Sequence, residues 1–130
     1  MMGTDSGETG FEDAKPVHGV TIRTLLMSKT LVTVEQYREC VIKGACTEPD
    51  ITAGSTSSII NKFCNWPGRD LYPVNCVNWK QAVQYAKFKG ARLPSESEWE
   101  YAATNGGKNQ KYPWGNDAPT DKNTVIYTHN

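Results

Sequence analysis

Four cysteines and two histidines are the residues of this chain best suited to metal or redox chemistry. The cysteines do not form the C-x-x-C pair typical of zinc sites, and His18 and His129 stand near opposite ends of the sequence. A structural zinc site is therefore not expected. No serine or cysteine lies in a G-x-S-x-G context, so neither histidine is predicted to activate a nucleophile. The cysteines are Cys40, Cys46, Cys64 and Cys76.

Disulfide bonds are the chemistry that the cysteine spacing favours. Four cysteines can pair in three ways. We favour Cys40–Cys46 and Cys64–Cys76, because each pair closes a short segment that contains turn-forming glycine or proline. The alternative is four reduced thiols buried in a cytosolic protein. Disulfides would instead indicate an oxidising compartment, such as the periplasm or the cell exterior.

A run of carboxylates stands at Glu96, Glu98 and Glu100. Residues two apart on a helix point to different faces, so this run is not predicted to form a metal or acid–base cluster. We expect the carboxylates to satisfy free N–H groups in the first turn of a helix and to favour the positive end of its dipole. Arg92, just upstream, can pair with one of them.

Polar residues near the end of the chain are the other candidates for a metal. Asp121 and Asn123 could ligate calcium through oxygen, but a polar turn is the simpler expectation. From the residues alone, no catalytic, cofactor-binding or metal-binding constellation is complete.

Three helices are expected to position these residues. Each begins with a capping box, in which the side chains of the N-cap residue and of the third helical residue accept each other's backbone N–H. Glycine then ends each helix, and Gly44 is expected to adopt the left-handed conformation. The N-cap residues are Thr33, Asn78 and Ser95, and the terminating glycines are Gly44, Gly90 and the pair Gly106–Gly107.

Strands are expected to be few and short. Alternating apolar and polar residues predict one over residues 17–27, and Val125–Tyr127 predicts a second. Trp79 and Trp99 are placed by the helical pattern on inward faces, as aromatic anchors of the core.

Composition narrows the classes of function. The 130 residues suit one domain, and 14 basic residues balance 14 acidic ones. Zero net charge argues against nucleic acid as a partner, because phosphate binding needs a basic excess. No apolar run is long enough to span a membrane, and the start lacks the pattern of a signal peptide. Eleven glycines, seven prolines and four tryptophans favour a loop-rich fold with aromatic anchors.

One motif carries a resemblance to a known family. Residues 91–103 read A-R-L-P-S-E-S-E-W-E-Y-A-A, and residues 112–115 read Y-P-W-G. Together they resemble the signature of the formylglycine-generating enzyme family, also called the sulfatase-modifying factor domain. Residues 31–37 and 73–85 resemble earlier family motifs in the same order, so the resemblance covers nearly the whole chain. The motif residues that we single out are Arg92, Glu96, Glu98, Trp99 and Trp114.

The resemblance implies an α+β fold, a modified C-type-lectin-like domain with about three helices, short strands and little regular structure. Bacterial family members with cysteines at these four positions are similar to this chain, which supports the proposed pairing. The implied location is the periplasm, the cell surface or the exterior.

The resemblance also implies a chemistry, although not for these residues. Family enzymes oxidise a cysteine of a sulfatase to formylglycine, using molecular oxygen and a copper(I) ion bound by two cysteines. That pair lies well beyond the Y-P-W-G motif, next to a G-G-S-W-like stretch, and the family's calcium ligands also lie mainly there. None of the four cysteines here matches the pair, so no catalytic, cofactor-binding or metal residue is carried over. Residues 1–130 are expected to be the N-terminal part of such a domain, inactive alone.

A second class of function stays open. The chain could be a non-catalytic C-type-lectin-like module in which variable loops, such as Ile51–Asn61, bind a protein or a glycan. In either case a part of a larger domain should expose apolar surface, and Trp114 and Val125–Tyr127 are candidates for it.

Overall fold

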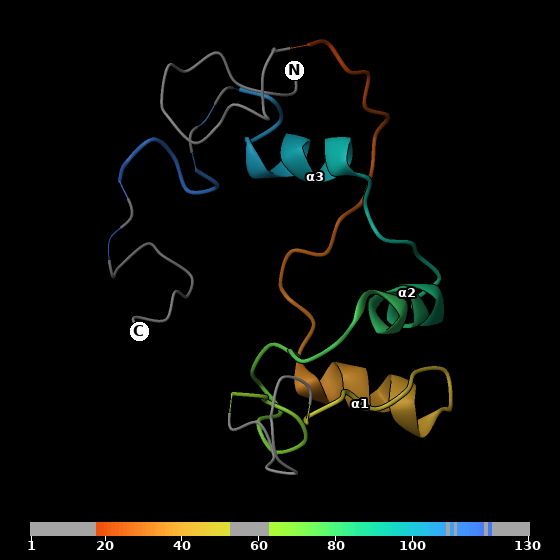
Figure 1. The fold of residues 1–130 in the computed structure, drawn as a ribbon. Helices are drawn as coiled ribbons and strands as arrows, with labels where there is room; N and C mark the ends of the chain where they lie inside the picture. Colours follow the sequence, from red (N-terminus) through yellow and green to blue (C-terminus); the bar gives the residue numbers. More distant parts are fainter. Residues whose placement is uncertain (1–17, 53–62, 109, 111, 119, 121–130) are drawn as a thin grey trace. The chain divides into compact units, whose positions relative to one another are not determined.

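The computed structural model describes residues 18–52, 63–108, 110, 112–118 and 120 (Figure 1). These residues contain three helices, α1 (Val34–Ile42), α2 (Trp79–Phe88) and α3 (Glu96–Ala103). The chain divides into two compact units. One unit is Leu25–Leu93, which holds α1 and α2, and the other combines Met1–Thr24 with Pro94–Asn130 and holds α3.

All three helices begin with the capping boxes that the sequence predicts. In α1, the Thr33 hydroxyl accepts the backbone N–H of Gln36 at 3.3 Å, while the Gln36 side chain accepts the backbone N–H of Thr33 at 3.0 Å. Asn78 with Gln81 and Ser95 with Glu98 repeat this arrangement in α2 and α3. Each box satisfies two backbone donors that a helix start otherwise leaves free.

The ends of α1 and α2 follow the prediction, whereas after α3 the first left-handed residue is Asn105, with a φ of 53°, and not Gly106. Gly44 and Gly90 have φ values of 72° and 69°, in the left-handed region that a glycine adopts without steric cost. The backbone N–H of Gly44 donates to Val41 at 2.9 Å, which closes the last turn of α1.

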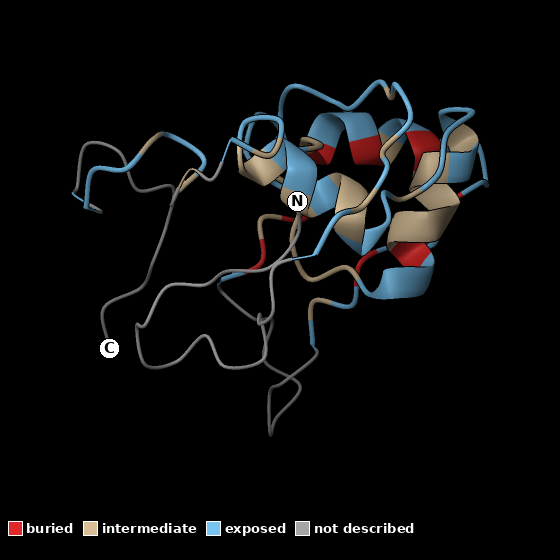
Figure 2. Ribbon diagram, turned by 90° about the horizontal axis from the view of Figure 1, so that it is seen from above, coloured by how far each residue is buried: buried red, intermediate tan, exposed pale blue. Residues whose placement is uncertain are grey.

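The core of the Leu25–Leu93 unit lies on one side of α1. It contains Val34 and Tyr37, both almost fully buried, with Cys40, Cys46 and Trp66 beside them. Figure 2 shows that buried positions are few and that exposed positions cover much of the ribbon. The Tyr37 ring meets Trp66 edge-on, with 6.1 Å between ring centroids, and stacks on Tyr85 of α2 at 5.8 Å. Aromatic contacts of this kind join α1, α2 and the loop around Trp66 into one core.

The buried side-chain amide of Gln81 links the loop after α1 to α2 by hydrogen bonds. Gln81 is 5% exposed, and its Nε2 donates to the Glu48 carbonyl at 2.6 Å and to the Thr47 hydroxyl at 3.2 Å. The Tyr37 hydroxyl donates to the Thr47 carbonyl at 2.9 Å. Thr47 therefore connects both helices through hydrogen bonds.

The expected strand over residues 17–27 is wrong for its described residues. Residues 18–27 contain no strand, and only His18 takes part in an isolated bridge. Alternation shows that one face of a segment is apolar, but a strand also needs a partner that pairs along several residues. Elsewhere in the described ranges the β structure consists of two antiparallel bridges, Thr33 with Pro73 and Tyr112 with Gly115. The expected strand Val125–Tyr127 lies outside the described residues.

The prediction that two tryptophans are buried in the core is also wrong. Trp79 is 71% exposed and Trp99 is 62% exposed. On α2 the stripe that faces the core is Gln81, Tyr85 and Phe88, so Trp79 lies on a different face of the helix. Trp99 belongs to α3, which contains no buried residue.

Candidate functional site

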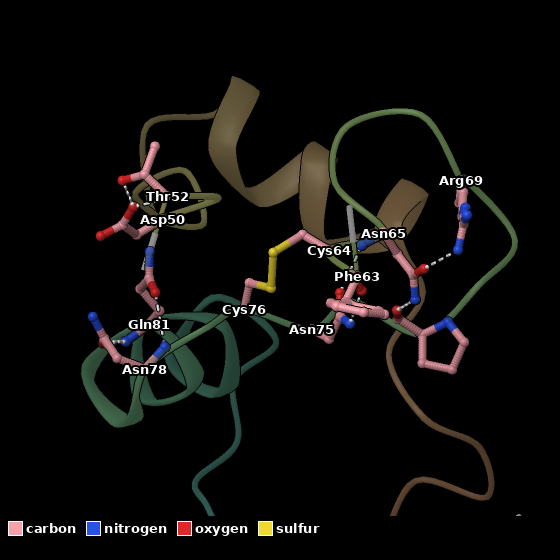
Figure 3. The surroundings of a disulfide bond; sticks show 11 residues. Asp50, Thr52, Phe63, Cys64, Asn65, Arg69, Asn75, Cys76, Asn78 and Gln81 are labelled. Carbon is pink, nitrogen blue, oxygen red and sulfur yellow. Dashed lines mark hydrogen bonds between the residues drawn. A yellow bond between two sulfur atoms is a disulfide. The ribbon is translucent and has the colours of Figure 1, made fainter. Parts of the chain in front are cut away.

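The four cysteines form the disulfides that the sequence favours. Cys40 is bonded to Cys46 and Cys64 to Cys76, with Cα–Cα distances of 5.3 and 5.7 Å. The first bond lies in the core beside α1, and the second joins the two ends of the loop 64–76 (Figure 3). No cysteine of the chain is free.

The ends of the loop 64–76 are also joined by two asparagine side chains. Asn75 accepts the backbone N–H of Asn65 and donates to the Phe63 carbonyl, each at 2.7 Å (Figure 3). Asn65 donates through its own amide to the Pro73 carbonyl at 2.7 Å. These bonds and the disulfide fix both ends of the loop.

A cation connects α1 to the same loop. The Arg38 guanidinium lies 5.6 Å from the centre of the Trp66 ring, within the range of a cation–π contact. It donates to Asp70 at 2.6 Å and to the Pro67 carbonyl. The hydrogen bond from Arg38 holds the pKa of Asp70 below its ordinary value and raises that of Arg38.

The loop and its flanks also present apolar side chains to solvent. Phe63, Leu71 and Tyr72 are 68%, 81% and 59% exposed. The Arg69 guanidinium lies 5.8 Å from the centre of the Tyr72 ring and donates to Asn65 at 3.2 Å. A loop that is fixed in place and carries exposed aromatic and aliphatic groups is suited to contact another molecule.

Three of the motif residues in the segment 91–103 lie at or just before the start of α3. The Glu98 carboxylate accepts the backbone N–H of Ser95 at 2.8 Å, and Glu96 also lies in the first turn of α3. Arg92 donates to the Leu93 carbonyl at 3.1 Å. Glu98 thus has the role that was expected of the carboxylates at the start of a helix.

The Y-P-W-G motif forms a turn. Tyr112 and Gly115 exchange backbone hydrogen bonds, and the rings of Tyr112 and Trp114 stack in parallel with centroids 5.1 Å apart. The Trp114 indole N–H donates to the Asp117 carbonyl at 3.2 Å. Trp114 remains 38% exposed, in agreement with its expected place on the surface.

The residues present do not fit the copper(I) site that the resemblance implies. Such a site needs two cysteine thiolates, whereas all four cysteines here are engaged in disulfides. Within the described ranges, no three histidine, cysteine or carboxylate side chains are grouped so that they could hold a metal ion. The calcium candidates Asp121 and Asn123, and also His129, lie outside those ranges.

Sequence reasoning missed the contacts around Trp66. Arg38 and Asp70 are separated by 32 residues, and no local pattern links them. The Asn65–Asn75 pair had one signal in the sequence, because the two asparagines flank cysteines that were expected to bond.

The described part of the chain contains no helix long and apolar enough to cross a membrane.

These features define a disulfide-bonded chain whose described residues form capped helices and little β structure. Its sequence matches the profile of the sulfatase-modifying factor enzyme 1-like domain over residues 1–129, and the chain belongs to that family.

Three relatives show the range of the family. The chain is 48% identical over 50 residues to the formylglycine-generating enzyme of Streptomyces coelicolor, covering 38% of this chain and 16% of that protein. It is 53% identical over 45 residues to the inactive C-alpha-formylglycine-generating enzyme 2 of Bos taurus, covering 35% and 15%. It is 46% identical over 147 aligned positions to the hercynine oxygenase of Mycobacterium tuberculosis, covering 93% and 34%. The chain thus spans between about a seventh and a third of these relatives, and no solved structure matches it significantly.

Proposed function

We propose that these residues form the scaffold part of a protein that resembles formylglycine-generating enzyme. In this proposal the domain oxidises a cysteine of a sulfatase, or of another peptide substrate, and the copper-binding cysteines lie outside residues 1–130. The observation that carries the proposal is that every cysteine of the chain is in a disulfide. The disulfides stabilise the scaffold and leave no thiolate for the metal.

The proposal also includes the fold of the protein and its cellular location. The fold is a modified C-type-lectin-like domain, and the two disulfides favour the periplasm, the cell surface or the exterior. Calcium, like copper, would be held by the larger domain rather than by the described residues.

An oxidation assay tests whether residues 1–130 are inactive without the copper-binding cysteines. Residues 1–130 are incubated with copper(I), oxygen and a cysteine-containing peptide that carries a sulfatase motif, and mass spectrometry follows the conversion of cysteine to formylglycine. We expect no conversion. The formylglycine-generating enzyme of Streptomyces coelicolor serves as the positive control in the same buffer.

Turnover by residues 1–130 would contradict the proposal. A second arm repeats the assay after the disulfides are reduced, because reduction frees four thiols that could bind copper(I). We expect no conversion there either, since the freed cysteines do not match the family's copper pair.

A non-catalytic binding module is the second candidate. It is favoured by Leu71 and Tyr72 on the disulfide-bonded loop and Phe63 on its flank, all exposed, and two of the related sequences are named as inactive. Of the expected binding loop Ile51–Asn61, residues 53–61 lie outside the described residues. Its ligand would be a protein or a glycan. The presence of a cysteine pair beside a G-G-S-W-like stretch in the complete gene product would support the oxidase, and its absence would support the module.

A further inference from the structure

The C-terminal end of α3 carries an Asn-Gly dipeptide. Asn105 is the only asparagine of the sequence that a glycine follows, and its side chain is exposed. Asn105, Gly106 and Gly107 have φ values of 53°, 76° and 75°, so three successive residues occupy the left-handed region. Gly106 has no side chain to hinder the approach of its backbone nitrogen to a neighbouring carbonyl group.

We propose that Asn105 is a site of spontaneous covalent modification, controlled by the opening of the end of α3. The backbone nitrogen of Gly106 attacks Cγ of Asn105, a new N–C bond forms, and the Cγ–Nδ2 bond breaks. The leaving nitrogen departs as ammonia with the proton from Gly106. Water then opens the resulting succinimide at either carbonyl, which yields an aspartyl or an isoaspartyl residue.

The helix end controls this reaction because the attacking nitrogen is engaged in the native structure. The N–H of Gly106 donates to the Tyr101 carbonyl at 2.8 Å, and the N–H of Asn105 donates to Ala102 at 3.3 Å. While the first bond is made, the nitrogen keeps its proton and is directed at Tyr101 rather than at Cγ of Asn105. The bond therefore has to open before the ring can close.

Opening should be frequent at this end. α3 has eight residues and none of them is buried, so little burial opposes fraying. The Tyr101 hydroxyl comes within 3.4 Å of the place where a Cβ of Gly106 would lie. The exposed Tyr101 ring is therefore the nearest side chain that shields Gly106.

The modification would change the helix end permanently. It adds a negative charge at the C-terminus of α3, where the dipole is already negative and the last turn has no basic residue. An isoaspartyl residue also inserts one carbon into the backbone between Thr104 and Gly106. The hydrogen bond from Gly106 to Tyr101 would then no longer fit.

The test compares rates of modification at Asn105 in residues 1–130 at mildly alkaline pH. Peptide mapping by mass spectrometry and labelling by an isoaspartyl methyltransferase give the rate. A synthetic peptide of residues 101–107 provides the rate without a helix, and we expect it to react faster than the folded chain. Asn105→Gln should abolish the labelling at this site.

Two matched variants test the control by the helix. Ser95→Ala removes the N-cap of α3, and we expect it to accelerate the modification by up to about fivefold. Thr33→Ala removes the N-cap of α1, in the other unit, and should leave the rate unchanged. No modification of the folded chain while the peptide converts completely would overturn the proposal. Equal rates for Ser95→Ala and the unmodified sequence would overturn the control by helix opening.

Discussion

At the scale of single residues, the ion pair between Arg38 and Asp70 predicts a dependence of stability on pH. The hydrogen bond from Arg38 lowers the pKa of Asp70 from its ordinary 3.8 in the folded state. The pair therefore stabilises the fold fully above that ordinary value, and this contribution disappears as the pH falls through the lower, folded-state pKa. We expect Asp70→Asn to unfold at a lower urea concentration than the unmodified chain at neutral pH. The two midpoints should converge in acid.

The effect should be small, because both side chains are partly exposed and solvent screens their attraction. Asp117→Asn removes an equal charge from an exposed carboxylate in the other unit and serves as the control. A midpoint difference for Asp70→Asn that stays constant down to strong acid would show that the pair does not titrate as argued.

Single residues also show where sequence reasoning succeeded. The pairing of Cys40 with Cys46 and of Cys64 with Cys76 could be predicted, because short spacing and turn residues limit the geometry. The contact of Arg38 with Trp66 could not, because it depends on how a loop 28 residues away in sequence returns to α1. Local spacing contains no information about that return.

At the scale of elements, the capping boxes of α1 and α2 differ in what their glutamines do. The side chain of Gln36 is exposed and caps α1, whereas that of Gln81 is buried and also bonds to Thr47 and Glu48. We expect Gln81→Ala to cost about 2–3 kcal/mol, because it leaves buried polar groups without partners. Gln36→Ala should cost about 1 kcal/mol or less.

Urea unfolding of the two variants measures this difference within one unit of the protein. Both substitutions remove the same side chain from the same helical position, so the comparison isolates the bonds across to the loop. Equal costs would mean that the hydrogen bonds of Gln81 to Thr47 and Glu48 contribute nothing beyond the cap.

The helices and the expected strand show how far local sequence patterns can predict secondary structure. All three helices were predicted with their N-caps, because the signals for a helix lie within a few residues of each other. The strand over residues 17–27 was wrong for residues 18–27, because a strand depends on a distant partner. The inward face of α2 was misjudged for a related reason: the polar Gln81 faces the core, and Trp79 does not.

At the scale of the whole molecule, the two disulfides should contribute differently. Loop entropy alone predicts a loss of about 2 kcal/mol without Cys40–Cys46 and about 3 kcal/mol without Cys64–Cys76, since the second closes a longer loop. The first pair is also part of the core, with Cys40 fully buried. We therefore expect replacement of Cys40 and Cys46 by alanine to cost more than its loop entropy, because it also leaves a cavity. Urea unfolding of the two double variants tests this, and a cost near 2 kcal/mol for the first pair would exclude the cavity contribution.

The division of the chain leads to a further prediction about folding. Both disulfides, the buried core, α1 and α2 all lie within residues 25–93. A unit of roughly 70 residues rarely has enough core to fold alone, but two disulfides reduce the entropy of its unfolded state. We expect residues 25–93, produced under oxidising conditions, to form both bonds and to keep the helical circular dichroism of α1 and α2. Reduction should unfold this fragment. A fragment with mispaired cysteines and no cooperative unfolding would show instead that residues outside 25–93 are required for this core to form.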